Sequence, residues 1–303
     1  MNEARRARLW SLLGDLPDSR PISAELTDSR PADGYRVDSL RLDLNGIEPV
    51  PAYLLVPDNL TAPAPGIVFN HSHGGHYHYG REELFLETDY FLSPYGPLLA
   101  QLGYVVIAID NWCFGERSHT GELDTFKKML WHGQWLWGMM MWDSHRAVDY
   151  LASRPEVDPA RLGTVGLSMG CTAAWWLAAL DVRIKAACGL VCLTEYQALM
   201  AHHMLQAHGI YYFIPSLLKH FQTEDIIRLI CPRAFLSCNG DQDAGTPPEG
   251  VERVKQIVAR DYAQAGVPDA LRILRYPVGH WETAEMRAEV VAWLARHLGG
   301  ATA

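Results

Sequence analysis

The sequence has no dense run of lysine or arginine. Its 303 residues carry 26 basic and 35 acidic side chains, which gives a formal charge of −9. Nucleic acids and anionic membrane surfaces are bound through basic patches, so this balance argues against both as partners. No apolar run is long enough to span a membrane, and the N-terminal residues lack the apolar core of a secretory signal peptide. We therefore expect a cytoplasmic protein. The sequence leaves open whether it forms homo-oligomers.

Cysteine gives no sign of a disulfide framework. The six cysteines, mostly inside apolar segments, are at positions 113, 171, 188, 192, 231 and 238. Hydrophobic residues make up 49% of the chain, with 10 Trp and 13 Tyr, so a large core can form without disulfides. We expect buried free thiols in a reducing compartment. No repeat, linker or boundary divides the chain, which predicts one domain over residues 1–303 with residues 1–36 as a helical or irregular extension.

The sequence does contain an alternation of strand-like and helix-like segments. This alternation is typical of an α/β fold, in which helices flank a mostly parallel sheet. An antiparallel pair is predicted at residues 37–44 and 51–56. Later strands are predicted at 66–70, 104–110, 161–167, 185–193, 233–238 and 271–276. A helical stretch over 123–153 is predicted to break near Gly133 or Gly138, and residues 194–230 to form a helical, irregular segment that can cover the site.

The most informative motif is the pentapeptide Gly166-Leu167-Ser168-Met169-Gly170. It lies between a buried strand pattern and the apolar helix pattern of residues 171–180. A G-x-S-x-G sequence between a strand and a helix is typical of the nucleophile elbow, a strained turn that presents a serine hydroxyl above the sheet edge. The flanking glycines let the neighbouring backbones pack closely. We predict that Ser168 is a nucleophile, the alternative being a serine in an ordinary turn.

An acyl-transfer triad in this arrangement continues with an acid after a late strand and a histidine after the last strand. The strand at 233–238 is followed by Asp241 and Asp243, and the strand at 271–276 by His280. We predict Asp243 as the acid because G-x-x-D is the usual spacing, and Asp241 as a residue that shapes the turn. His280 is predicted as the base; its alternative is a capping or solvated loop histidine.

An acyl-transfer site also needs donors for the oxyanion. The amide of Met169, at the start of the helix after the elbow, is the first predicted donor. The second is expected in the loop after the strand at 66–70, which has the sequence Asn70-His71-Ser72-His73-Gly74-Gly75-His76-Tyr77-His78. We predict the amide of His73, with that of Gly74 as the alternative.

The same loop offers a competing interpretation. His71, His73, His76 and His78 form H-x-H-x-x-H-x-H, which superficially resembles the H-x-H-x-D-H motif of binuclear zinc hydrolases. Gly75 stands where that motif has its aspartate. A zinc site would also leave the elbow and His280 unexplained. We therefore predict no metal and no other cofactor, with the histidines lining or bracing the pocket.

Taken together, these residues resemble the dienelactone-hydrolase-like and acetyl-xylan-esterase-like branch of the bacterial α/β-hydrolases, from about Val37 onward. The resemblance rests on the histidine-glycine loop and on several flanking segments: Gly80-Arg81-Glu82-Glu83, Asp110 with Phe114-Gly115-Glu116-Arg117, Trp142-Asp143, Arg146-Ala147, Glu156-Val157-Asp158-Pro159 with Arg161, and Pro232-Arg233. It implies an α/β-hydrolase fold and a serine esterase. Cys171 follows the elbow where relatives often have a second glycine, and Ser168 replaces the nucleophilic cysteine of dienelactone hydrolases proper.

The function predicted from the sequence is a serine carboxylesterase that acts on small acyl or aryl esters. Aromatic and methionine side chains, many in residues 126–142 and 196–221, favour an apolar pocket, although core packing explains most of the first group. A carbohydrate deacetylase would use the same triad. A peptidase of the prolyl-oligopeptidase type is disfavoured because the chain is too short for the gating domain. A non-catalytic binding protein is disfavoured because no triad member is missing.

Overall fold

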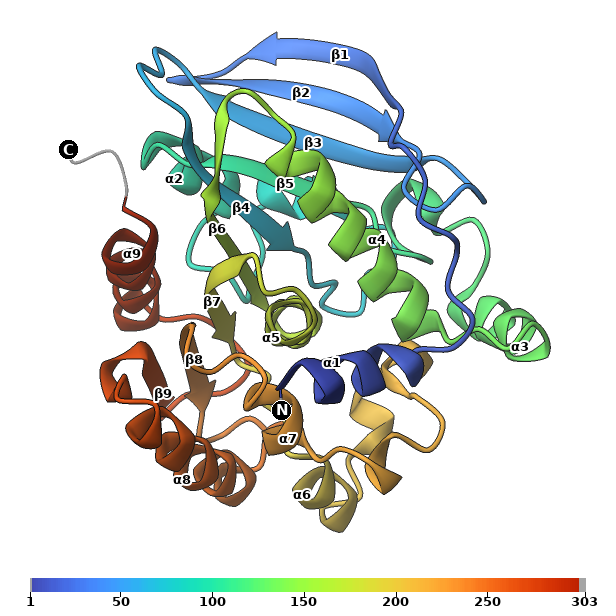
Figure 1. Cartoon of the computed structure of the whole chain (residues 1–303), viewed down its shortest axis with the longest axis vertical. Helices are drawn as coiled ribbons and strands as arrows, with labels where there is room; N and C mark the ends of the chain where they lie inside the picture. Colours follow the sequence, from blue (N-terminus) through green and yellow to red (C-terminus); the bar gives the residue numbers. More distant parts are fainter. Residues whose placement is uncertain (1, 300–303) are drawn as a thin grey trace.

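The computed structural model describes residues 2–299. Its strands form one central sheet (Figure 1). Their order is β1-β2-β3-β5-β4-β6-β7-β8-β9. The strands are β1 Ala24–Pro31, β2 Tyr35–Leu42, β3 Val50–Pro57, β4 Ala64–Asn70, β5 Val105–Ile109, β6 Val157–Leu167, β7 Ile184–Leu190, β8 Ala234–Gly240 and β9 Leu271–Tyr276. Strands β1, β2, β3 and β5 pair with one another antiparallel, in that order. Strands β5, β4, β6, β7, β8 and β9 pair parallel, in that order. The predicted sheet, mostly parallel with an antiparallel start, is confirmed.

Helices cover both faces of this sheet. They are α1 Asn2–Ser11, α2 Tyr95–Gln101, α3 Glu122–Trp131, α4 Leu136–Ala152, α5 Met169–Leu180, α6 Tyr196–Ala201, α7 Thr223–Ile227, α8 Pro248–Gln264 and α9 Ala284–Leu298. Apolar side chains of α2 and α9 pack on one face, and those of α1, α4, α5 and α8 on the other. Figure 1 shows α2 and α9 on the opposite side of the sheet from α1, α4 and α5. No helix within residues 2–299 combines the length and apolar character needed to cross a membrane.

The N-terminal region differs from its prediction as a helical or irregular extension. Residues 24–31 form β1, which pairs antiparallel with β2. Every residue of β1 is exposed, and its sequence lacks the apolar alternation that marks a half-buried strand. The backbone pairing with β2 therefore forms this strand without a hydrophobic pattern, so the residues of β1 carry no local signal of a strand.

The long helical stretch divides at Gly133 rather than at Gly138. Gly133 has φ +69° and lies between α3 and α4, in the left-handed region that glycine adopts without strain. Gly138 lies inside α4, where a Cβ atom would overlap the backbone oxygen of Leu13. One glycine therefore ends a helix, and the other allows the chain after α1 to approach α4 closely.

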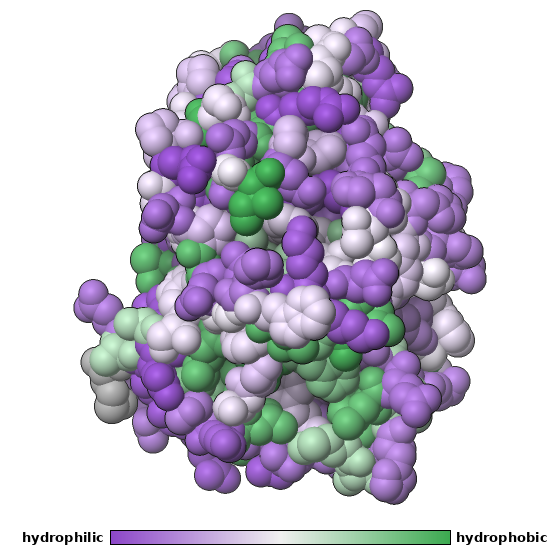
Figure 2. Space-filling view, turned by 90° about the vertical axis from the view of Figure 1, so that its right-hand side faces the viewer, coloured by the Kyte–Doolittle hydropathy of each residue, from purple (hydrophilic) through white to green (hydrophobic). Residues whose placement is uncertain are grey.

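The segment between β7 and β8 is helical and irregular, as predicted. It contains α6, α7 and short 3-10 turns at Leu205–Ala207, Ile210–Tyr212 and Leu217–Lys219. Figure 2 shows one face of the molecule, with hydrophobic residues gathered in its lower half. Figure 1 places α3 and the segment between β7 and β8 at the same height. Leu130 of α3 and Leu205 are among the exposed apolar side chains.

Candidate active site

The predicted nucleophile lies in a strained turn at the end of β6. Ser168 has φ +56° and ψ −119°, a conformation that residues other than glycine rarely adopt, and α5 begins at the next residue. Its backbone N–H donates to the oxygen of Leu190 at 2.9 Å, which ties the turn to β7. A Cβ at Gly166 would overlap the backbone of Gly170, and one at Gly170 would overlap the oxygen of Asn70. Both flanking glycines therefore permit the close backbone contacts expected of an elbow.

The three predicted triad residues lie in one hydrogen-bonded chain. His280 Nε2 lies 2.8 Å from Ser168 Oγ, and His280 Nδ1 lies 2.7 Å from Asp243 Oδ2. Asp243 is buried, and its other carboxylate oxygen accepts the N–H of Gly245 at 2.9 Å. This fixed acceptor favours the imidazole tautomer with a proton on Nδ1 and a free lone pair on Nε2 facing the serine.

Asp241 lies outside this chain. Its carboxylate accepts a hydrogen bond from Arg275 Nε at 2.6 Å on the surface, while Asp243 turns inward to His280. The structure therefore brings Asp243, and not Asp241, to the imidazole.

The predicted oxyanion donors are free to bind a ligand oxygen. Within residues 2–299, the amides of Met169, His73 and Gly74 donate to no protein acceptor. Met169 is the first residue of α5, so its N–H also lies at the positive end of the helix dipole. Gly74 has φ +52°, and a Cβ there would meet the ring of Tyr90. The loop can therefore keep unpaired N–H groups in place at the end of β4.

A buried glutamate braces this loop from below. Glu83 Oε2 accepts the N–H of Ser72 at 2.6 Å, and Glu83 Oε1 accepts the hydroxyl of Tyr90 at 2.5 Å. Burial raises the pKa of Glu83 to about 7, although both hydrogen bonds act in the opposite direction. In the sequence Glu83 is only one residue of the family resemblance, because nothing local shows that residue 83 folds back against residue 72.

The histidines of the loop have separate partners. His71 donates from Nδ1 to the oxygen of Ser72 at 2.7 Å and accepts the N–H of Asn111 at Nε2. His73 accepts the N–H of Gly75 at Nδ1, so its proton lies on Nε2, which is 3.0 Å from the hydroxyl of Tyr211. Within residues 2–299, no three His, Cys, Asp or Glu side chains converge on a point suited to a metal ion.

Burial also determines the charge of these histidines. It lowers the pKa of His71 to about 4. Burial, with a smaller contribution from neighbouring histidines that include His280, lowers the pKa of His73 to about 4 as well. Both rings are therefore neutral near pH 7, and they act on the loop as hydrogen-bonding groups and not as cations.

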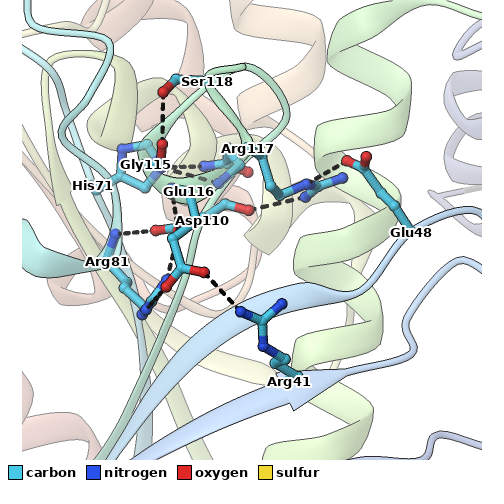
Figure 3. A network of polar contacts seen from close by, with 10 residues as sticks. Arg41, Glu48, His71, Arg81, Asp110, Gly115, Glu116, Arg117 and Ser118 are labelled. Atoms are coloured by element: carbon cyan, nitrogen blue, oxygen red, sulfur yellow. Dashed lines mark hydrogen bonds and ion pairs between the residues drawn. The ribbon is translucent and has the colours of Figure 1, made fainter. Parts of the chain in front are cut away.

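A polar network holds the loop after β5 against the histidine loop (Figure 3). Asp110 accepts hydrogen bonds from the backbone of Arg81 at 2.7 Å and of Glu116 at 3.0 Å, and it pairs with the Arg81 guanidinium. Glu116 pairs with Arg81 and Arg41. Arg117 pairs with Glu48 at 2.7 Å and with the fully buried Asp143 at 2.9 Å. Glu116, Arg117 and Asp143 therefore brace the loop after β5 through ion pairs.

The segment between β7 and β8 reaches the site through two aromatic side chains. The hydroxyl of Tyr211 contacts His73, and its backbone N–H donates to Glu122 of α3 at 2.8 Å. His208 stacks on Tyr212 with ring centroids 4.4 Å apart. Burial, with a smaller contribution from nearby His280, lowers the pKa of His208 to about 4. Tyr211 and His208 are thus further residues beside the site, and both belong to the aromatic 196–221 segment that the sequence favours as part of a pocket.

The aromatic and methionine side chains of the 126–142 stretch are mostly core residues. Trp137, Met139, Met140 and Met141 are almost completely buried in the cluster on the α4 face of the sheet. Core packing, the explanation favoured for this group, is confirmed. All six cysteines are free, and all but Cys231 are buried.

The site combines a strand, an elbow and a helix within a mostly parallel sheet with an acid and a histidine that follow the last two strands. This combination defines an α/β-hydrolase. The chain belongs to the Abhydrolase family, whose sequence model matches residues 13–296.

The chain is similar to known proteins over nearly its whole length. It is 45% identical over 299 residues to a protein of Bacillus subtilis (strain 168) named "Putative hydrolase YtaP", which covers 98% of this chain and 100% of that relative. Among solved structures, a "putative acetyl xylan esterase" from Bacteroides fragilis has a TM-score of 0.72 at 18% identity, over 91% of this chain and 74% of that one. A glucuronoyl esterase from Solibacter usitatus has a TM-score of 0.72 at 16% identity, over 95% and 91%. The α/β-hydrolase fold is thereby confirmed.

Proposed function

We propose that the protein is a serine carboxylic-ester hydrolase that acts through Ser168, His280 and Asp243. The observation that carries the proposal is the chain of two hydrogen bonds, 2.8 Å from Ser168 Oγ to His280 Nε2 and 2.7 Å from His280 Nδ1 to Asp243. A serine hydroxyl in contact with an oriented imidazole is an activated nucleophile.

The reaction follows from these positions. Ser168 Oγ attacks the ester carbonyl carbon while His280 takes the hydroxyl proton. The carbonyl oxygen becomes an oxyanion, which accepts hydrogen bonds from the amides of Met169 and His73, or of Gly74 in place of His73. Removing one such donor usually costs about 3–4 kcal/mol of transition-state stabilisation. His280 then protonates the leaving alcohol, which leaves an acyl-enzyme, and a water molecule activated by the same imidazole releases the carboxylic acid.

The names of the similar proteins support an ester substrate. The solved neighbours are described as a "putative acetyl xylan esterase" and a glucuronoyl esterase, and both descriptions name an esterase. We propose small acyl esters as substrates, with aryl or simple alkyl alcohols. The six free cysteines are consistent with a reducing cytoplasm as the compartment.

A carbohydrate deacetylase with the same triad is the second candidate. The observation that favours it is the openness of the site: the His280 side chain is 43% exposed, and Trp281 next to it is 46% exposed. An open site admits an alcohol larger than a simple alkyl or aryl group.

Covalent labelling tests the proposed mechanism. A fluorophosphonate should inactivate the enzyme with one equivalent bound, and mass spectrometry should locate the adduct on the 166–170 peptide. Ser168→Ala should remain unlabelled and lose at least about a thousandfold in kcat, because the acyl-enzyme cannot form. A chelator should have little effect. Activity that is lost on chelation and restored by Zn²⁺, with Ser168 unlabelled, would contradict the proposal and favour the histidine loop.

A further inference from the structure

Trp281, the residue after the proposed catalytic base, presents an apolar ring at the surface. Its side chain is 46% exposed, although it lies in the loop between β9 and α9 beside His280. Isolated exposed apolar residues are common and need no explanation by themselves. This ring differs because the backbone beneath it is shaped to hold it.

Gly279 provides that support. A Cβ at Gly279 would overlap ring atom Cζ3 of Trp281 and would lie 2.9 Å from Cη2 and 3.0 Å from Cε3. The φ angle of Gly279 is outside the left-handed region, so the turn itself does not require glycine. The missing side chain instead leaves room for the indole, which lies on the backbone two residues before it. The ring is therefore fixed in place while nearly half of the side chain remains exposed.

Hydrogen bonds connect this loop to the segment that contains Tyr90 and Leu92, and Tyr90 packs against the predicted oxyanion loop. The N–H of Glu282 donates to the oxygen of Tyr90 at 2.8 Å, and Glu282 Oε2 accepts the N–H of Leu92 at 3.1 Å. The ring of Tyr90 in turn lies against Gly74. Leu92 in this connecting segment is itself 52% exposed.

The position beside His280 indicates which part of a substrate the ring would meet. In ester hydrolysis the protonated imidazole delivers its proton to the leaving alcohol oxygen, so the alcohol must lie against His280 Nε2. Trp281 directly follows His280 in the chain, so its backbone adjoins the residue that the alcohol must contact, and its exposed ring is the nearest large apolar side chain along the chain. The acyl carbon, in contrast, lies at Ser168 and between the oxyanion donors.

The surroundings favour a sugar ring as the alcohol. A pyranose has one face of C–H bonds, which packs on an aromatic face, and an edge of hydroxyl groups that stays hydrated. Gln242 is exposed and is hydrogen-bonded to the loop that carries Trp281. Its backbone N–H donates to the backbone oxygen of Val278 at 2.9 Å, and its side-chain amide donates to the backbone oxygen of Pro277 at 3.1 Å. An aryl alcohol would favour an enclosed apolar pocket, whereas this ring has an open, polar border.

We propose that Trp281, seated on Gly279, is a binding platform for the pyranose ring of the alcohol part of an acetylated saccharide. The proposal rests on the proposed serine-esterase function and, of its two candidate substrate classes, selects the carbohydrate ester over the aryl or simple alkyl ester. Trp281 binds the substrate and does not take part in proton transfer.

Kinetics on two acetate esters test the platform. A monoacetylated methyl xyloside and ethyl acetate share the acyl group and differ in the alcohol. Trp281→Ala should lower kcat/KM on the xyloside by about tenfold or more, mainly through KM, since stacking is lost. It should leave ethyl acetate within about twofold, with the same pH profile of kcat/KM, and Trp281→Phe should recover most of the loss. Trp131→Ala, which removes a 90% exposed tryptophan from α3, should change neither substrate and serves as the matched control.

The outcomes separate this proposal from the proposed function. An equal loss on both esters in Trp281→Ala, or no loss on either, would overturn the platform while the serine mechanism stands. A wild-type enzyme that hydrolyses neither ester and is not labelled at Ser168 would overturn the proposed function, and the platform with it. A selective loss on the xyloside supports both.

Discussion

The carboxylate of Glu83 lies 2.6 Å from the backbone nitrogen of Ser72 and accepts its hydrogen bond in the interior of the protein. Ser72 directly precedes His73, whose amide is a proposed oxyanion donor. The position of that amide therefore depends on a buried, ionisable side chain that makes no contact with the triad.

Removing this carboxylate should weaken both the fold and catalysis. Glu83→Ala leaves the Ser72 N–H and the Tyr90 hydroxyl without an acceptor, which should lower the free energy of unfolding by roughly 3 kcal/mol. Glu83→Gln keeps one acceptor oxygen for Ser72 and should lose less. Urea denaturation and kcat of both variants check this. Equal stability of Glu83→Ala and the wild type would contradict the bracing role.

The same residue should make stability depend on pH. Burial raises the pKa of Glu83 from 4.5 to about 7, so between these values the folded protein holds a proton that the unfolded chain has released. The contribution of Glu83 to stability therefore declines as pH rises from about 4.5 to 7 and is constant above that range. Denaturation of the wild type and Glu83→Gln across pH 4.5–8 measures it: the wild type should lose stability relative to the variant over that window. A constant difference would contradict the raised pKa.

The two aspartates after β8 should differ sharply. Asp243→Asn should lower kcat by roughly three to four orders of magnitude, because the amide no longer holds the required imidazole tautomer. Asp241→Asn breaks only a surface pair with Arg275, worth about 0–1 kcal/mol in comparable cases, and should leave kcat within a few fold. Steady-state kinetics on one acetate ester distinguishes them, and similar losses in both variants would contradict the choice of Asp243.

A methyl group at the elbow should be costly. Gly170→Ala places a Cβ against the backbone oxygen of Asn70, and backbone atoms of β4 and the elbow cannot move aside as a flexible side chain can. The expected loss of stability is about 1–3 kcal/mol, with a clear fall in kcat because Asn70 begins the oxyanion loop. Gly121→Ala is the control, since a Cβ there meets nothing within 4 Å and the backbone is extended. Thermal unfolding of both variants checks the difference, and equal melting temperatures would refute it.

The hydroxyl of Tyr211 should affect turnover more than binding. Tyr211→Phe keeps the stacking on Trp137 but removes the acceptor for His73 Nε2–H. Because the backbone of the same histidine is a proposed oxyanion donor, kcat should fall by about tenfold with little change in KM. Tyr212→Phe is the matched control, since that hydroxyl has no hydrogen-bond partner within residues 2–299. An effect confined to KM would instead place Tyr211 in substrate binding.

The elements that form the site could be predicted because each has a local signal. Ser168 and Asp243 follow strands that end in buried, mostly apolar runs, and His280 follows β9, in which apolar and basic residues are mixed. Parallel strands bring their carboxyl ends to one edge of the sheet. Strand β1 could not be predicted, because it is exposed on every residue and shows no apolar alternation. The roles of Glu83 and Tyr211 also had no local signal. Their partners are Ser72 and His73, and only the folded chain brings those residues together.

The strand order has a consequence for the way the enzyme loses activity. Ser168 follows β6, which lies inside the sheet between β4 and β7, whereas His280 follows β9, the outermost strand. Proteins open locally before they unfold globally, and an edge strand paired on one side is among the parts that separate most readily. Detachment of β9 would remove the imidazole from the serine while the inner strands stay paired. Thermal inactivation is therefore expected to precede the loss of the sheet, with refolding of the C-terminal edge enough to restore activity.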